Sequence, residues 1–231
     1  MIDHRPLASL GGGDHGWLKA RHHFAFAGVG NPAHATIGAL KVWNDDTIAP
    51  HSGFPLHAHS DIEIITYVRE GAITHEDSLG NQGRTEAGDV QVMSAGSGIH
   101  HAEFNAEDVP TRMFQIWLRT RTRGGAPGWA HRAFPKTDRG GKFVALASGN
   151  GQVGALEIDA DADVLGATVK AGETLSYALG AAASAYLVPA AGRILLNGIE
   201  LAPGDGAAIR DEDHISITAI DDTEIVLVTL L

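Results

Sequence analysis

The sequence predicts an all-β protein built from two similar barrel-like domains, and three observations lead to this prediction. Short segments rich in β-branched and aromatic residues, such as 61–68 and 111–118, recur with turn-forming residues between them. The first half contains no segment with the 3.6-residue hydrophobic period of a helix. The second half repeats the outline of the first. Repeated short strands without helices are typical of sandwiches and closed barrels.

The first half contains a series of expected strands, at 17–24, 40–46, 61–68, 71–78, 90–93 and 111–118. Glycine and asparagine mark the turns between several of them. Turn-forming residues then concentrate at 124–141, which we interpret as a linker. We therefore predict an N-terminal domain at 1–133 and a C-terminal domain at 134–231.

The internal repeat is seen in the spacing of glycines and turns. Segment 71–89 is echoed by 192–205, in which Asn197-Gly198 stands between apolar residues as a strong hairpin signal. Upstream, the pattern Gly-x3-His-x-His of segment 53–59 is matched in segment 172–178 by Gly-x3-Ser-x-Ala. The second copy has therefore lost a pair of histidines that the first copy contains.

Two pairs of side chains in the first half predict a metal site. His57 and His59 are two residues apart, and so are His101 and Glu103. Residues two apart on a strand project from the same face. If the two strands lie side by side in a barrel, three imidazoles and one carboxylate converge. A single histidine on a strand is more often a structural residue, as we expect for His214 in the second half, but two pairs with the same spacing favour ligands.

The types of these side chains restrict the metal. Imidazole with carboxylate suits a transition metal, whereas magnesium and calcium require mostly oxygen ligands. Zinc would also accept this set. The chain contains no cysteine, which excludes disulfides, thiolate zinc sites and cysteine nucleophiles. A structural zinc barrel is the weaker alternative because structural zinc sites are usually closed and rich in thiolate.

Composition excludes several classes of partner. The 231 residues include 17 Lys and Arg against 28 Asp and Glu, for a net charge of −11. Direct binding of nucleic acid normally requires a basic face, so we do not expect it. The first residues lack the charged-then-apolar layout of a signal peptide, and no apolar run approaches the length of a membrane helix. We expect a cytoplasmic protein with no membrane partner.

The stretch from 53 to 105 resembles the paired motifs of the cupin superfamily. The first motif is represented by Gly53, His57, His59, Glu63 and Gly71, and the second by Gly88, Gly96, His101 and Asn105. The departures are a shortened first gap, Ser94 where proline is usual, and two extra residues before the histidine of the second motif. Glu63 stands where general cupins place their carboxylate ligand. Its strand parity leaves open an inward orientation beside the ligands.

Within that superfamily the chain is most similar to pirins and bacterial pirin-like proteins. The similarity is carried by segments 53–59, 63–71, 75–81 and 97–103. It implies a bicupin, with iron as the usual metal and with a metal site only in the N-terminal barrel. The ligands would be His57, His59, His101 and Glu103, since pirins take their carboxylate from the position of Glu103.

The resemblance also implies an activity. Bacterial pirin-like proteins resemble quercetin 2,3-dioxygenases, which cleave flavonols with dioxygen and release carbon monoxide. The cofactor would be Fe(II), with Ni, Mn, Co, Cu or Zn as alternatives, and Glu103 would be the catalytic base toward the flavonol 3-hydroxyl. The alternative function is that of eukaryotic pirins, which are iron-containing, redox-sensitive cofactors that bind a protein partner instead of turning over a substrate.

Overall fold

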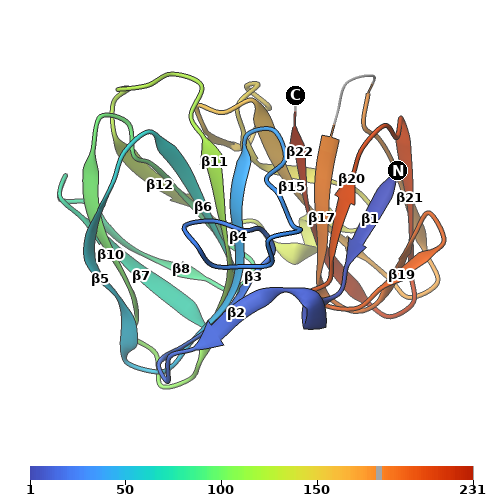
Figure 1. The fold of residues 1–231 in the computed structure, drawn as a ribbon, viewed down its shortest axis with the longest axis horizontal. Coiled ribbons are helices and arrows are strands. Elements are labelled where there is room, and N and C mark those ends of the chain that lie inside the picture. The colour runs from blue at the N-terminus through green and yellow to red at the C-terminus, as the bar shows by residue number, and fades with distance from the viewer. Residues whose placement is uncertain (181–183, 231) are drawn as a thin grey trace. The chain divides into compact units, whose positions relative to one another are not determined.

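The structure, a computed structural model, describes residues 1–180 and 184–230. These residues form two compact units, which we call the N-terminal barrel (Gly11–Phe134 with Leu156–Asp161) and the C-terminal barrel (Met1–Leu10, Pro135–Ala155 and the chain from Ala162). The all-β prediction is confirmed, because the described residues contain strands and two short 3-10 helices, η1 (Leu7–Ser9) and η2 (Lys136–Arg139), but no α-helix (Figure 1). None of their helices is long and apolar enough to cross a membrane.

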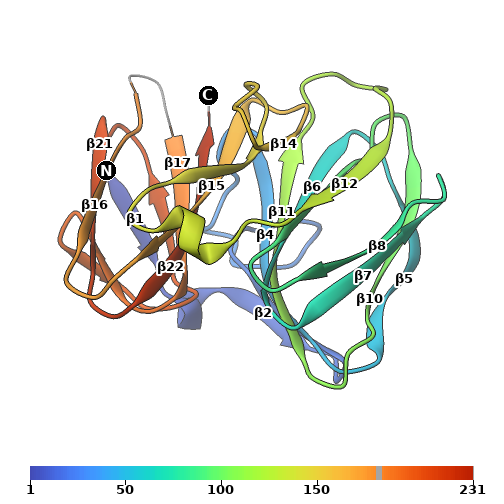
Figure 2. The ribbon, with the colours of Figure 1, turned by 180° about the vertical axis from the view of Figure 1, so that it is seen from behind.

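The N-terminal barrel consists of two facing antiparallel sheets (Figure 2). The larger sheet has the order β12-β9-β6-β11-β4-β3-β2 and the smaller has the order β5-β10-β7-β8. The strands of the larger sheet are β2 (Gly11–Asp14), β3 (Leu18–His22), β4 (Leu40–Ile48), β6 (Ile62–Glu70), β9 (Val90–Ser94), β11 (Thr111–Arg119) and β12 (Gly128–Arg132). Those of the smaller are β5 (Ser52–His59), β7 (Ala72–Asp77), β8 (Gln82–Glu86) and β10 (Ile99–Asn105), and the short β14 (Leu156–Glu157) lies in the segment Leu156–Asp161.

The interior of the N-terminal barrel is layered, because alternate residues of each strand point inward. Strands β6 and β11 supply three cross-strand pairs to this interior, Ile64–Trp117, Thr66–Gln115 and Val68–Met113. The first and third pairs belong to two apolar clusters, at different levels of the barrel. The middle pair is polar and hydrogen bonds to Glu103 on the opposite sheet. A polar layer therefore lies between two apolar ones.

The C-terminal barrel is built in the same way. One sheet runs β1-β20-β17-β22-β15-β13 and the other runs β16-β21-β18-β19. Figure 1 shows β1, in blue, beside the orange-red strand β20 with which it pairs. The strands are β1 (Ile2–Arg5), β13 (Val144–Ser148), β15 (Ala162–Val169), β16 (Thr174–Ala178), β17 (Ser184–Ala191), β18 (Ile194–Leu196), β19 (Ile199–Leu201), β20 (Gly206–Ile209), β21 (His214–Ala219) and β22 (Thr223–Leu230). Its interior is a cluster of buried aliphatic side chains.

The predicted hairpin at Asn197-Gly198 is confirmed. The two residues connect β18 and β19 and both have positive φ, 46° and 84°. A two-residue turn of this kind needs positive φ at both positions, which asparagine and glycine adopt most readily.

The internal repeat is also visible in the contacts. Gly71 follows β6 with φ 74° and lies against Thr111, whose hydroxyl donates to the carbonyl of Ala72. Gly192 follows β17 with φ 70° and lies against Thr223, whose hydroxyl donates to the carbonyl of Ala191. The same turn is thus built twice, and β6, β7 and β11 correspond to β17, β18 and β22.

This turn generates a stability prediction. A Cβ at Gly192 would lie 2.4 Å from the carbonyl oxygen of Asp222, whereas one at Gly198 would meet nothing within 4 Å. We expect Gly198→Ala to lower the free energy of unfolding by about 1 kcal/mol, from left-handed strain alone. Gly192→Ala should lower it by about 2–4 kcal/mol, because overpacking adds to that strain. Urea unfolding compares the two, and equal losses would contradict the close approach.

Candidate metal centre

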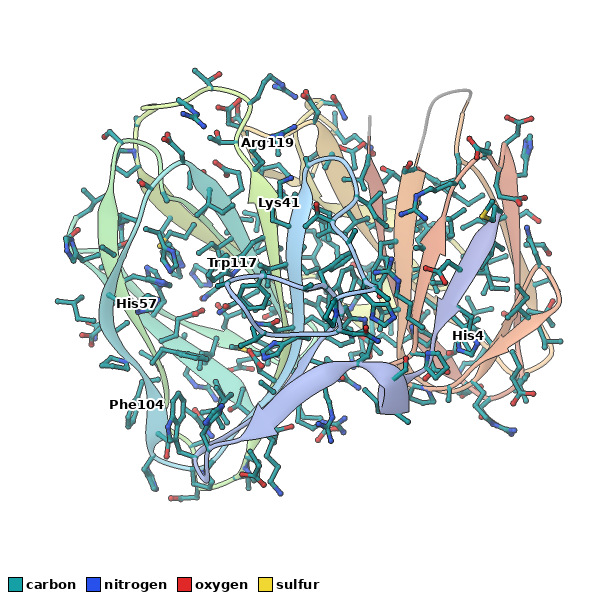
Figure 3. All side chains as sticks on the ribbon, in the orientation of Figure 1. His4, Lys41, His57, Phe104, Trp117 and Arg119 are labelled. Atoms are coloured by element: carbon teal, nitrogen blue, oxygen red, sulfur yellow. The ribbon has the colours of Figure 1, made fainter. Side chains whose placement is uncertain are left out.

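Three of the four predicted ligands meet inside the N-terminal barrel. Strands β5 and β10 are antiparallel neighbours, with His57 directly opposite His101 and His59 opposite Ile99. The three imidazoles present one nitrogen each within 4.8 Å of one another, and their ring centroids are 4.5–5.1 Å apart. In Figure 3, His57 on β5 and Trp117 on β11 come from opposite walls of this barrel. One strand pairing thus brings together histidines that are more than 40 positions apart in the sequence.

The protonation state of these histidines suits a metal. Nδ1 of His57 is 2.7 Å from the carbonyl oxygen of Pro55. Because a carbonyl can only accept, Nδ1 donates this hydrogen bond, which leaves Nε2 as the nitrogen that can bind a metal. Burial, followed by the repulsion of His57, lowers the pKa of His59 to about 4. Burial, followed by the repulsion of His57 and His59, lowers the pKa of His101 to about 3. His59 and His101 are therefore neutral near pH 7 and can act as metal ligands.

Unpartnered nitrogens show that the cluster fits a cation. Nε2 of His59 and both ring nitrogens of His101 are buried and have no hydrogen-bond partner among the described residues. Buried polar atoms in proteins almost always have a partner, so nitrogens that find none among the protein atoms are suited to bind an ion. A divalent transition metal would engage these lone pairs. The donor set and its geometry therefore fit the metal site predicted from the sequence.

Glu103 lies in the polar layer of the same barrel. It follows His101 by two residues on β10 and is fully buried. Its Oε1 accepts hydrogen bonds from Thr66 (3.1 Å) and Gln91 (2.8 Å), and its Oε2 accepts one from Gln115 (2.7 Å). Burial raises the pKa of Glu103 to about 7, although the three donors oppose this. Glu103 is not part of the three-histidine group, so its role as a ligand stays a prediction.

The residues that hold Glu103 are a part of the site that the sequence analysis missed. Gln91 is itself oriented by the hydroxyl of Thr85, and Gln115 by Nε1 of Trp117. Their signal in the sequence is a polar residue in the middle of an otherwise apolar strand, as in Val90-Gln91-Val92-Met93. Such a residue is costly to bury unless it has a polar partner inside.

Glu63 does not support the histidines. It is buried, and its Oε2 accepts a hydrogen bond of 2.6 Å from Ser94, directly opposite on β9. Thr66, three positions along β6, points to Glu103, so Glu63 faces the other side of the sheet. The inward orientation left open in the sequence analysis is therefore wrong. Burial raises the pKa of Glu63 to about 7.

Aromatic and apolar side chains surround the histidine cluster. Trp117 lies edge-on to His59, with ring centroids 5.0 Å apart. Ile64, Met93 and Ile99 form a buried cluster with Trp117 and Trp129 packed against it. This wall would exclude water from one side of a bound metal and could accept a flat apolar molecule.

The C-terminal barrel has different residues at the corresponding positions. Leu196 on β18 is four residues after Gly192, as His75 is after Gly71, and it pairs with Ile217 where His75 pairs with Glu103. Ile217 therefore occupies the place of Glu103, and Ile215 that of His101.

The next strand completes this correspondence. Tyr177 pairs with Ile215 and so stands in the place of His57, while His214 is exposed like His100. The sequence alignment that matched His57 with Ser176 was wrong by one residue. Among the described residues, the expectation of a single histidine site in the first barrel holds.

Comparison with known proteins gives one consistent result. The family model described as Pirin matches residues 4–118, and the model described as quercetinase C-terminal cupin domain matches residues 145–230. A pirin-like protein of Caulobacter vibrioides is 63% identical over 99% of each chain. A protein of Escherichia coli named quercetin 2,3-dioxygenase is 36% identical over 100% of this chain and 99% of its own. The crystal structure of the E. coli bacterial pirin YhhW in complex with nickel(II) superposes with a TM-score of 0.93, at 34% identity, covering 100% of this chain and 99% of that one.

The pKa of Glu63 generates a pH prediction. Its pKa rises from 4.5 in the unfolded chain to about 7 in the folded one, so the folded state binds more protons between these values. Glu63 therefore destabilises the fold progressively as pH rises from 5 to 8. Glu63→Gln keeps an acceptor for Ser94 without this charge. We expect its stability relative to wild type to increase by about 2 kcal/mol from pH 5 to pH 8. A difference independent of pH, measured by urea unfolding, would contradict this.

Proposed function

Because the chain belongs to the pirin family, we propose that it is a metal-dependent dioxygenase that cleaves flavonols such as quercetin with dioxygen and releases carbon monoxide. The observation that carries this proposal is the convergence of three imidazoles, of which His59 and His101 are neutral near pH 7 and have buried nitrogens without a hydrogen-bond partner among the described residues. The name of the E. coli relative supports the activity, and the nickel complex of the related pirin supports the metal.

We propose His57, His59, His101 and Glu103 as the metal ligands and Fe(II) as the resident ion, with Ni, Mn, Co, Cu or Zn able to replace it. Four protein ligands leave positions open on an octahedral ion. When bound, such an ion supplies Lewis-acid and redox chemistry toward a flavonol and dioxygen. Glu103 can act as a metal ligand, because its Oε2 accepts only one hydrogen bond among the described residues and so keeps a lone pair for the ion.

Glu103 is also the candidate general base. A flavonol must lose the proton of its 3-hydroxyl to become electron-rich, and Oε2 of Glu103 is the acceptor that we assign. Burial holds the pKa of this carboxyl at about 7 without a metal, near the range in which a base works best at neutral pH. A bound cation would lower it. Gln91 and Gln115 hold the carboxylate in place. Trp117 and the apolar side chains on which it packs would orient the flat substrate and exclude water.

A second candidate function is a regulatory one, in which the metal-containing protein binds a partner protein. Leu56 and Phe104 favour it, because they lie on the strands that carry His57 and His101 and are 66% and 43% exposed. A contiguous exposed apolar patch is typical of a contact surface. Two measurements distinguish these functions. An enzyme should show flavonol turnover that saturates at low flavonol concentration, whereas a regulatory protein should retain a protein partner in a redox-dependent way.

The dioxygenase proposal predicts carbon monoxide. Protein loaded anaerobically with Fe(II), Ni(II) or Mn(II) and incubated with quercetin should release carbon monoxide once oxygen is admitted. His57→Ala should bind little metal by elemental analysis and release none. His214→Ala, which removes an exposed histidine of the C-terminal barrel, serves as the matched control and should behave as wild type. Absence of carbon monoxide with all three metals would count against the activity.

The Glu103 network predicts a separate effect. Gln115→Leu removes a donor to Oε2 while keeping the volume of the side chain. Metal affinity, measured by chelator competition, or turnover should fall about 10- to 100-fold, as is usual when a hydrogen bond to a ligand is lost. Gln82→Leu removes a glutamine of the same barrel whose side chain, among the described residues, hydrogen bonds to the exposed Glu76, and should change neither. Wild-type affinity and turnover in Gln115→Leu would mean that Glu103 needs no such support.

A further inference from the structure

A continuous series of aromatic rings connects the histidine cluster with the protein surface. The ring of His101 lies 5.4 Å from that of His75 on the neighbouring strand β7. His75 stacks on Trp129 at 4.9 Å with 4° between the ring planes, and Trp129 stacks on His131 at 5.0 Å with 17°. His75 is fully buried and His131 is exposed. We call His75, Trp129 and His131 the ring path.

The ring path is held in place on several sides. Trp129 and His131 are two residues apart on β12, so they share a face of that strand. A Cβ at Gly83 on β8 would lie 2.2 Å from the indole, so the absence of a side chain there makes room for the ring. His75 is oriented by a 3.0 Å hydrogen bond from its Nε2 to the buried carboxylate of Asp77. The surrounding strands therefore hold His75, Trp129 and His131 in this stacked arrangement.

The surroundings of Trp129 suit one-electron chemistry. Indole is among the most easily oxidised side chains, and loss of one electron leaves it a cation. Its Nε1 is buried without an acceptor among the described residues, so the ring has no group to which it can pass its proton. The carboxylate of Asp77, beyond His75, favours a positive charge nearby. Electron tunnelling decays steeply with distance, so rings in contact divide a long transfer into short steps.

The series that starts at the other tryptophan beside the cluster runs through a phenylalanine, Phe26, to His22. Trp117 meets His59 edge-on, and its further ring neighbour is Phe26 at 6.1 Å. Phenylalanine is far harder to oxidise than tryptophan. Nε1 of Trp117 also donates a hydrogen bond to Oε1 of Gln115. The ring path through Trp129 is thus the better conductor to the surface.

We propose that the ring path carries single electrons from a diffusible reductant at the surface to the metal site. It would act when dioxygen is partly reduced there without cleavage of a substrate. The inference rests on the proposed dioxygenase function, since it assumes oxygen chemistry at this site. Trp129 gives one electron to the site and regains one from a reductant of the ascorbate type near His131. No bond forms or breaks and no proton leaves Trp129. Without this supply, the oxidising equivalents attack the ligand imidazoles.

The test uses Fe(II)-loaded protein exposed to hydrogen peroxide with ascorbate and without any flavonol. Oxidation of His57, His59 and His101 is measured by peptide mass spectrometry, and retained iron by elemental analysis. Trp129→Phe should show several-fold more ligand oxidation and faster loss of iron than wild type. Trp129→Tyr should fall between wild type and Trp129→Phe, because a phenol is oxidised more readily than a phenyl ring but must also release its proton. A role in packing alone would make the two variants alike.

Two further variants complete the test. His131→Leu shortens the ring path at an exposed position that the fold does not need, and should increase ligand oxidation in the same direction. Trp17→Phe removes an indole that reaches His57 only through the ring of Phe54, which is hard to oxidise, and should match wild type. Equal oxidation in wild type, Trp129→Phe and His131→Leu would overturn the inference, as would equal damage in Trp129→Phe and Trp129→Tyr. The carbon monoxide assay reports on the dioxygenase function separately.

Discussion

The register between β5 and β10 is the constraint on which the rest of the site depends. It places His57 opposite His101, and strand alternation then turns His59 to the same side. A shift of one residue in either strand would turn that strand's ligands to the outer face. The corresponding pair in the C-terminal barrel, β16 and β21, shows what the same frame does with other residues. There the inward positions carry Tyr177 and Ile215, and the barrel closes on an aliphatic core.

Layering explains how one barrel accommodates both a core and a polar site. Strands β6 and β11 each contribute an apolar, a polar and an apolar residue at successive inward positions, as Ile64, Thr66 and Val68 do on β6. Glu103 in this polar layer has its hydrogen bonds supplied internally, because glutamine and threonine donors from three strands converge on its carboxylate. Buried polar groups are tolerable only under this condition. The three histidines, by contrast, lie beyond the hydrogen bonds that surround Glu103.

The fold and most of the site could be predicted because their determinants are local. Strand alternation, turn residues such as Asn197-Gly198 and the repeated two-residue spacing of the ligands are all readable along the chain. What could not be predicted depends on pairing between distant strands. The face of Glu63 followed from Ser94 on β9, and the true partner position of His57 in the second half followed from the register of β16 with β21. Neither register has a signature within its own strand. Gln115 belonged to the same class, since only its partner on β10 explains why it is buried.

The contrast between the two barrels also has an energetic consequence. The aliphatic interior of the C-terminal barrel gains stability from burial alone, at roughly 25 cal/mol per Å² of apolar surface. The N-terminal barrel instead buries imidazole nitrogens without partners, and each such atom costs about 1–3 kcal/mol. A cation that binds only the folded state would offset this cost by mass action. The stability of the first barrel should therefore be coupled to its metal, while that of the second should not. Duplication followed by loss of the histidines in one copy would leave a chain in which one barrel stabilises itself and the other is free to keep a reactive, partly unsatisfied interior.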